Sequence, residues 1–154
     1  MGWRNCRYSV FYGNDDATTS TQQFDAILAK YPNVAGIIAP TTVGVLAAAQ
    51  EKKAKSATVA ITGLGLPSQM APYIEDGTVL QVGLWNPIDL GYVAVYAAAE
   101  AASGTFKGTV GSTFFAGKTA KAKKTYTVTA GGITYLGDPF TFNKSNIETF
   151  KSIY

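Results

Sequence analysis

Short apolar runs alternate with amphipathic stretches through the first two thirds of the chain. Three of these runs, at 34–39, 58–62 and 79–84, consist mostly of apolar residues. Strands have this composition when they lie in a parallel sheet whose two faces are both covered. We therefore predict a strand at each run. A further short strand is expected at 8–12, where the chain reads YSVFY and then meets a glycine.

The stretches between these runs carry the signals of helices. Phe24, Ile27 and Leu28 lie at positions i, i+3 and i+4 and predict an apolar face on a helix that ends near residue 30. Asp15, Asp16 or one of the following threonines is expected to cap its start. Three more helices are expected, at 43–53, at 67–76 between a first-turn proline and Gly77, and at 88–102.

The alternation of strands and helices over residues 8–102 predicts an α/β fold with an open parallel sheet and right-handed crossovers. After Gly104 the pattern changes, because glycine and threonine become frequent and the apolar runs become shorter. The features expected there are short strands at 126–129 and 133–136, a turn at Asp138-Pro139, and a terminal helix at 143–150 capped by Ser145.

The composition excludes several classes of chemistry. Hydrophobic residues make up 47% and charged residues 15% of the 154 residues, which argues against disorder. The net charge of +3 is too small to indicate a nucleic-acid partner, and the basic run at 118–124 is interpreted as a solvated loop. The chain has no histidine and a single cysteine, Cys6, so no internal disulfide is expected. We expect no catalytic residue, no metal and no cofactor.

Candidate ligand-binding residues follow two of the predicted strands. In open α/β sheets, ligands bind at the carboxyl ends of the parallel strands. Pro40, Thr41 and Thr42 come directly after one predicted strand, although helix capping explains the threonines as well as ligand contact does. Trp85 and Asn86 follow another strand. A tryptophan offers a flat apolar face to a sugar ring, and an asparagine amide forms hydrogen bonds with hydroxyls. A tryptophan that only packs on the rim of the sheet would give the same sequence pattern.

Two other motifs carry simpler interpretations. Gly63-Leu64-Gly65 lacks the third glycine of a dinucleotide fingerprint, because Gln69 and Met70 follow where that pattern needs one. Asn14, Asp15 and Asp16 lack the further oxygen ligands of a calcium loop, so a turn and a helix cap are expected there.

Several long segments resemble a known family in order and spacing. They are YGNDDATTSTQQFDAILAKYPNVAGIIAPTTVGVLAAAQ, ITGLGLPSQMAPYIEDGTV, LWNPIDLGYVAVYAAA and the ending GDPFTFNKSNIETF. Together they resemble the rhamnose-binding proteins of bacterial ABC transporters and, less closely, the relatives that bind autoinducer-2. The resemblance covers about 11–154. It implies a type I periplasmic-binding fold, with two flavodoxin-like lobes joined by a three-stranded hinge and a ligand in the cleft between them. It therefore implies a binding protein and not an enzyme.

The resemblance also implies roles for particular residues. Pro40 and Thr42 stand where autoinducer-2 binders approach their ligand through backbone and side chain. Trp85 stands where ribose-binding relatives place a ligand residue in the hinge. Gly65 stands where those relatives carry an aspartate ligand, so the resemblance implies that this contact is absent here.

The organisation that follows from the resemblance is one partial domain at 1–154. It would contain second-lobe βα units at 8–84, a hinge and long helix at 85–104, and hinge and β segments at 105–154. No signal peptide is seen at the start of the chain, and a truncated fragment of the two-lobed protein is expected. The implied partners are a monosaccharide or related small polyol and an ABC transporter permease, with a periplasmic or cell-surface location. The face of the helix at 88–102 is expected to stay exposed, pack elsewhere or pair with another copy.

Three alternatives stay open at this point. An autoinducer-2 receptor belongs to the same family. A sugar-responsive repressor of the lactose-repressor type shares the lobe fold, but it needs a helix-turn-helix that is not seen in this chain. An enzyme of flavodoxin-like fold is disfavoured by the absence of histidine and of a phosphate loop.

Overall fold

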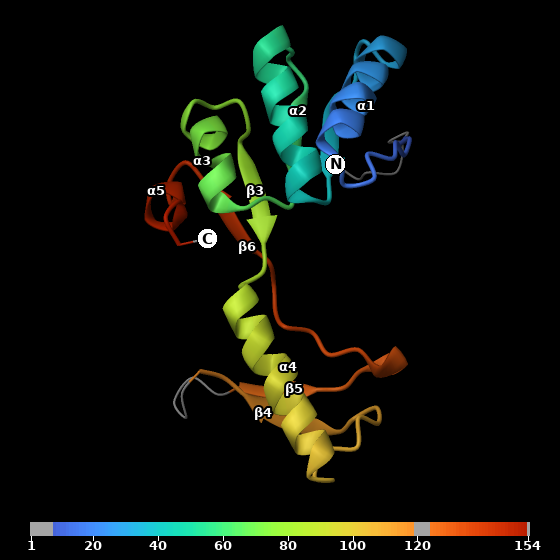
Figure 1. Cartoon of the computed structure of the whole chain (residues 1–154), viewed down its shortest axis with the longest axis vertical. Helices are drawn as coiled ribbons and strands as arrows, with labels where there is room; N and C mark the ends of the chain where they lie inside the picture. Colours follow the sequence, from blue (N-terminus) through green and yellow to red (C-terminus); the bar gives the residue numbers. More distant parts are fainter. Residues whose placement is uncertain (1–7, 119–123, 154) are drawn as a thin grey trace, which may run out of the picture. The chain divides into compact units, whose positions relative to one another are not determined.

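A computed structural model describes residues 8–118 and 124–153 of the chain (Figure 1). Cys6 and most of the basic run at 118–124 lie outside the described residues. Contacts between residues divide the chain into two compact units. Unit 1 contains the residues up to Leu84 together with those from Thr141 onward, and unit 2 is Trp85–Phe140. The expected organisation of 1–154 as one partial domain stays a prediction.

Unit 1 is built from parallel strands connected by helices. Its elements are α1 (Ala17–Lys30), β1 (Gly36–Ala39), α2 (Thr42–Lys55), β2 (Ala60–Gly63), α3 (Pro67–Glu75), β3 (Gln81–Leu84), most of β6 (Phe140–Asn143), and α5 (Ile147–Phe150). Strands β1 and β2 pair in parallel. A parallel bridge between Leu64 and Gly83 continues the arrangement to β3, which also pairs with β6. The predicted α/β fold with a mainly parallel sheet is confirmed.

The ends of the helices follow the expected local signals. Asp16 is the residue that caps α1, because its side chain accepts a hydrogen bond of 2.7 Å from the backbone N–H of Thr19. Pro67 occupies the first turn of α3, where no helical hydrogen bond needs its missing N–H. Gly77 follows Asp76 at the end of α3 with a φ of +82°. This is the left-handed conformation that glycine adopts most easily.

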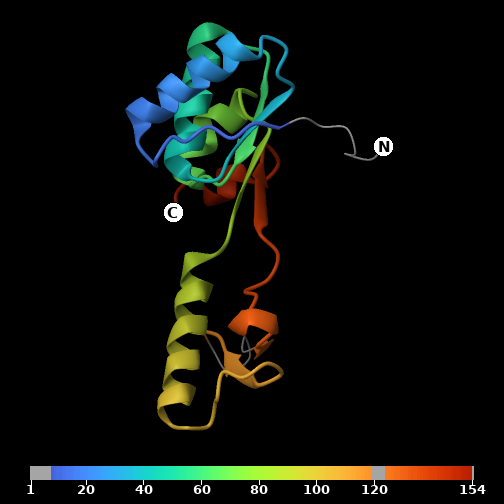
Figure 2. The same cartoon turned by 90° about the vertical axis from the view of Figure 1, so that its right-hand side faces the viewer.

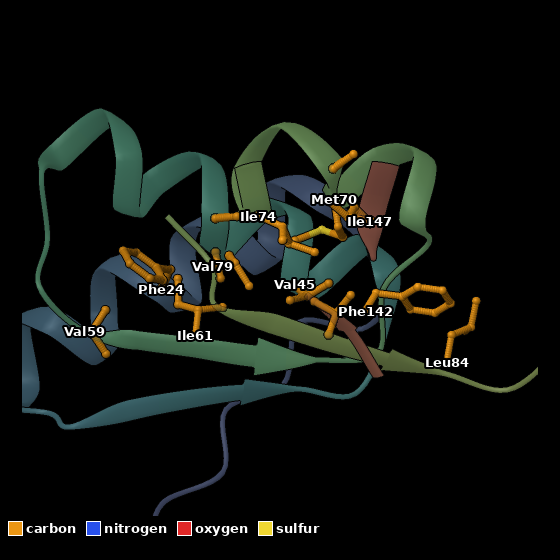
Figure 3. Packing of buried hydrophobic residues seen from close by; sticks show 14 residues of the cluster. Phe24, Val45, Val59, Ile61, Met70, Ile74, Val79, Leu84, Phe142 and Ile147 are labelled. Atoms are coloured by element: carbon orange, nitrogen blue, oxygen red, sulfur yellow. The ribbon is translucent and has the colours of Figure 1, made fainter. Parts of the chain in front are cut away.

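The core of unit 1 lies between the sheet and its helices (Figure 3). Phe24 of α1 and Met70 of α3 are both almost fully buried. Ile61 of β2 and Val82 of β3 meet them from the sheet. The last residues of the chain return to the same cluster, where Phe142 and Ile147 are 3% and 1% exposed. The C-terminal segment is therefore an integral part of unit 1.

Two expectations about the strands of unit 1 are wrong. Residues 8–12 form no strand, and Tyr8, Val10 and Tyr12 are largely exposed. A strand needs a neighbour to take its backbone hydrogen bonds, and these residues have none among the described parts of the chain. The strand expected at 34–39 begins only at Gly36, and one of its faces is open, since Ile38 is 75% exposed.

Unit 2 combines one long helix with an antiparallel pair of strands. Its elements are α4 (Pro87–Ala102), β4 (Thr113–Ala116), β5 (Lys124–Thr127) and a short 3-10 turn, η1 (Ala130–Gly132). Helix α4 contacts β4. The ring of Phe114 stacks on that of Tyr126 with centroids 5.6 Å apart, and the tilted ring of Phe106 lies 4.9 Å from Phe114 on the same measure. No residue of α4 is fully buried.

The region after Gly104 departs most from the sequence prediction. The run at 133–136 forms only one isolated bridge, between Ile133 and Thr129, whereas β4 and β6 were not anticipated. The terminal helix is shorter than expected, and Asn146 precedes it instead of Ser145. Ser145 lies in the preceding turn, where its N–H and hydroxyl donate to the Asn143 side chain.

Truncation of Ile147 is expected to destabilise unit 1. The change Ile147→Ala removes a side chain that is 1% exposed and should cost about 2–5 kcal/mol in the free energy of unfolding. Ile153→Ala is the matched control, because Ile153 is 53% exposed and should change stability little. Urea unfolding followed by circular dichroism measures both. Equal effects of the two changes would show that the C-terminal segment does not share the core.

Unit 1 is also expected to lose stability in acid through Asp76. A hydrogen bond of 2.6 Å from Lys53, together with hydrogen bonds from Thr78, lowers the pKa of Asp76 from 3.8 to about 2. The ionised form is favoured in the folded state, so this stabilisation is complete above about pH 4 and is lost as the pH falls toward 2. The effect is modest, because both side chains are partly exposed and solvent screens the pair.

Urea unfolding between pH 5 and pH 2 measures this loss. Asp76→Asn should flatten the dependence, whereas Asp138→Asn, at an exposed carboxylate of unit 2, should leave it unchanged. An unaltered acid dependence in Asp76→Asn would contradict the assignment.

Candidate ligand-binding site

The carboxyl ends of β1 and β2 lie at one edge of unit 1. Ala39 pairs with Gly63 at the last position of the two parallel strands, so the residues that follow them emerge together. Pro40 is exposed there, and Thr41 and Thr42 are half-buried. The structure thus brings these three predicted site residues to the edge where open α/β sheets bind ligands.

The hydroxyl of Thr41 caps helix α2. Its Oγ1 accepts a hydrogen bond of 3.1 Å from the backbone N–H of Gly44, and Thr42 is the first helical residue. A hydroxyl has one proton and two lone pairs, so a capping threonine still has a proton to donate to a ligand oxygen. The capping role expected as the simpler alternative is therefore present, and it is compatible with ligand contact.

Two glycines bring the loop after β2 close to the core. A Cβ at Gly63 would lie 1.8 Å from the backbone oxygen of Ala39, so only glycine allows the ends of β1 and β2 to approach this closely. A Cβ at Gly65 would lie 2.7 Å from Cγ of Met70 and 3.2 Å from Cγ1 of Val45. A larger residue at 65 would have to displace core side chains, and the loop offers no side chain to a ligand at that position.

Trp85 and Asn86 are the first residues of unit 2. The side chain of Trp85 is 42% exposed, and Asn86 caps helix α4. The Asn86 Oδ1 accepts hydrogen bonds of 2.9 and 3.3 Å from the N–H groups of Ile88 and Asp89. Its Nδ2 amide has no acceptor among the described residues and can donate to a ligand. That Trp85 and Asn86 share one rim with Pro40 stays a prediction.

The structure adds two polar side chains that the sequence assigned only to a turn and a cap. Asn14 and Asp15 are exposed, with left-handed φ values of 53° and 55°, and they lead into α1. In Figure 1 the first turns of α1 and α2 lie at the same end of unit 1. Sequence reasoning did not consider these two side chains as ligand contacts, although the preference of asparagine and aspartate for the left-handed conformation was an available signal.

The described residues contain no cluster of three metal-ligating side chains. Likewise, no helix in the described part of the chain is long and apolar enough to cross a membrane. The polar groups of the candidate residues are hydroxyls, amides and carboxylates, and they lie beside the backbone of proline and glycine residues. Neutral polyhydroxyl compounds are recognised by groups of these kinds together with apolar surface.

Comparison with known proteins gives a consistent result. The model of a periplasmic binding protein domain matches residues 3–106. An ABC transporter solute-binding protein from Clostridium phytofermentas, solved with bound L-rhamnose, is 41% identical with a TM-score of 0.82, covering 94% of this chain and 48% of that chain. A sugar ABC transporter protein from Actinomyces odontolyticus is 40% identical with a TM-score of 0.71. The match covers 90% of this chain and 44% of that chain.

A third solved structure shares the fold. LsrB from Clostridium saccharobutylicum, in complex with AI-2, is 24% identical with a TM-score of 0.75, covering 91% of this chain and 47% of that chain. At this identity the likeness shows the fold alone. The chain spans about half the length of each of these solved relatives.

The capping role of Thr41 gives a testable expectation. Thr41→Ala should lower the free energy of unfolding by about 1 kcal/mol, because the N–H of Gly44 loses its acceptor. Thr41→Ser keeps the hydroxyl and should retain most of the stability. Thermal unfolding followed by circular dichroism compares the two. If the alanine and serine variants melt alike and below the wild type, the threonine methyl group and not the cap carries the effect.

Proposed function

Since the chain belongs to the periplasmic binding protein family, we propose that it forms part of the sugar-binding component of a bacterial ABC transporter. Its ligand is a deoxyhexose such as L-rhamnose. The observation that carries this proposal is the 41% identity, over 94% of this chain, to a protein solved with L-rhamnose. In this role the chain binds and delivers a ligand and performs no chemical reaction.

The candidate residues offer the contacts that such a ligand needs. Pro40 and the hydroxyls of Thr41 and Thr42 form one wall, with donors and acceptors for ring hydroxyls. Trp85 supplies a flat apolar face for the C–H side of the ring, and the Asn86 amide donates to a further oxygen. A 6-deoxy sugar carries a methyl group as well as hydroxyls, so it suits a wall that mixes apolar and polar groups.

An autoinducer-2 receptor is the second candidate within the family. It is supported by the shared fold with a protein that holds AI-2, but at 24% identity this support is weaker than that for the sugar. The ligand-binding lobe of a sugar-responsive repressor is the alternative from another class. A signal sequence in the same reading frame would favour transport, whereas a helix-turn-helix would favour repression.

The remaining partners follow from the transporter role. We infer an ABC transporter permease as the protein partner and a periplasmic or cell-surface location. Helix α4 has no fully buried residue, and its Ile88, Leu90 and Val95 are 52%, 44% and 67% exposed. Apolar surface of this kind favours association, so we also infer self-association through residues 88–102 when the chain is alone.

The chain alone is expected to bind L-rhamnose only weakly. A two-lobed site buries most of its ligand, and the loss of several hydrogen bonds at about 0.5–1.5 kcal/mol each turns micromolar into roughly millimolar affinity. Titration followed by NMR chemical shifts measures dissociation constants in this range. L-rhamnose should shift backbone signals near Pro40 to Thr42, and Trp85→Ala should weaken the binding.

The control for the aromatic contact is Phe115→Ala, because Phe115 is an exposed ring of unit 2 outside the proposed site. Micromolar affinity for this chain, together with sedimentation as a stable monomer, would contradict the one-wall site. Shifts with autoinducer-2 and none with L-rhamnose would favour the receptor alternative.

A further inference from the structure

The loop that joins α3 to β3 contains the dipeptide Asp76-Gly77. It is the one place in the sequence where an aspartate or an asparagine precedes a glycine. At such a dipeptide the main-chain nitrogen of the glycine can attack the side-chain carboxyl group, because glycine has no side chain to hinder the approach. Both residues are exposed, and a Cβ added at Gly77 would meet nothing within 4 Å. The dipeptide is therefore open to water.

The reaction at this dipeptide needs no co-reactant other than water. The nitrogen of Gly77 loses its proton and forms a bond to Cγ of Asp76, while one carboxyl oxygen leaves as water. The product is a five-membered succinimide ring. Water then adds to one of the two ring carbonyl carbons. Addition at Cγ restores aspartate, whereas addition at the main-chain carbon gives isoaspartate, in which the chain continues through the side chain.

The folded structure opposes this ring closure at three points. The ring needs Cβ of Asp76 and the nitrogen of Gly77 on the same side of the Cα–C bond, but the observed ψ of -6° turns them away from each other. The N–H of Gly77 is engaged, because it donates a hydrogen bond of 3.3 Å to the backbone oxygen of Ile74. The carboxylate of Asp76 accepts hydrogen bonds of 2.6 Å from Lys53 and 2.9 Å from the N–H of Thr78.

Lys53 acts on the carboxyl group itself. Its hydrogen bond contributes most to lowering the pKa of Asp76 to about 2, and ring closure needs the neutral acid, since an ionised oxygen is a poor leaving group. Lys53 lies in the last turn of α2, which is on the same side of the strands as α3 (Figures 2 and 3). The neighbouring Lys52 donates a hydrogen bond of 2.7 Å to the backbone oxygen of Thr78, so α2 holds the loop at two points.

We propose that Asp76-Gly77 is a modification site, at which Asp76 converts spontaneously to isoaspartate, and that Lys53 protects this site in the folded protein. The reaction proceeds through local opening of the loop, in which ψ of Asp76 rotates and the N–H of Gly77 is released. Its rate therefore follows the population of the open loop. The inference depends neither on the ligand nor on the transport role of the chain.

Isoaspartate at this position would disturb the core of unit 1. It adds one carbon atom to the main chain between α3 and β3 and moves the carboxylate away from Lys53. Val79 lies three residues beyond Asp76, is 0% exposed, and donates a hydrogen bond of 2.8 Å from its N–H to the backbone oxygen of Tyr73. A longer connection strains these closely packed anchors, so the modified chain should unfold at a lower urea concentration.

The test incubates the whole chain at about pH 5, where more of the neutral acid is present than at neutral pH, in water enriched in the heavy oxygen isotope. Each passage through the succinimide leaves one heavy oxygen atom at residue 76, which mass spectrometry of peptides locates. The isoaspartyl peptide is separated by chromatography and quantified. We expect the label to appear at Asp76 before any other aspartate. It should appear at least about tenfold more slowly in the folded chain than in the chain unfolded in urea, because a protected loop reacts only on opening.

Three variants decide whether Lys53 provides the protection. Lys53→Gln should accelerate labelling of the folded chain by about two- to fivefold, which is the scale of one exposed ion pair. Lys53→Arg keeps the cation and should react like the wild type. Lys151→Gln is the matched control, because it removes an ion pair of 3.3 Å to Glu75 at the same end of α3 and leaves Asp76 untouched. Circular dichroism confirms that each variant folds.

Any of four results would overturn the proposal. They are equal labelling of the folded and unfolded chains, labelling of another aspartate before Asp76, labelling at residue 76 without an isoaspartyl peptide, and a Lys53→Gln variant that reacts no faster than Lys151→Gln. None of these results depends on L-rhamnose binding, so the sugar proposal stands or fails separately.

Discussion

The parallel pairing of β1 with β2 is the constraint on which the rest of unit 1 depends. It aligns the carboxyl ends of both strands. The N–H of Leu64 donates a hydrogen bond of 3.0 Å to the backbone oxygen of Ala39, and the absence of a Cβ at Gly63 makes this close approach possible. Helices α2 and α3 begin immediately beyond this edge. Their positions on the sheet, and the buried cluster beneath them, follow from the crossovers that the pairing imposes.

Two of the candidate residues, one in each unit, have a structural role of their own. Thr41 and Asn86 each occupy the cap position of a helix that follows a strand, and each uses one oxygen for the cap. Their remaining hydroxyl proton and amide group stay available to a ligand. Capping holds these side chains in a defined direction, so less side-chain entropy is lost when a ligand binds. In the proposed site, a structural requirement of the helix would thus prepare a polar group for contact with the ligand.

The two units differ in how far their apolar residues are buried. Unit 1 has a continuous core that includes the returning residues Phe142 and Ile147. Unit 2 has a small aromatic stack around Phe114, and its long helix leaves much apolar surface in contact with water. A helix that is apolar on most of its circumference is typical of a larger packed structure. The difference agrees with the length of the solved relatives, which extend well beyond the matched region.

The sequence by itself determined the features that depend on local chemistry. The apolar face of α1, a cap of that helix at Asp15, Asp16 or a following threonine, and the proline in the first turn of α3 all act within a few residues of one another. The three apolar runs predicted strands at the right places, and their alternation with helices predicted a parallel sheet. The candidate residues from Pro40 to Thr42 followed from the same reasoning, because their position after a strand is a property of chain order.

Only the tertiary structure decided which strand-like segments have partners. Residues 8–12 read as a strand but form none, while β4 and β6 pair although their sequences gave no clear signal. A strand is stabilised by hydrogen bonds to a neighbour that can lie anywhere in the chain, so its existence cannot be judged from its own residues. The same holds for the exposure of Ile38 and for the close packing at Gly65, which depend on what covers a face and on side chains from distant segments.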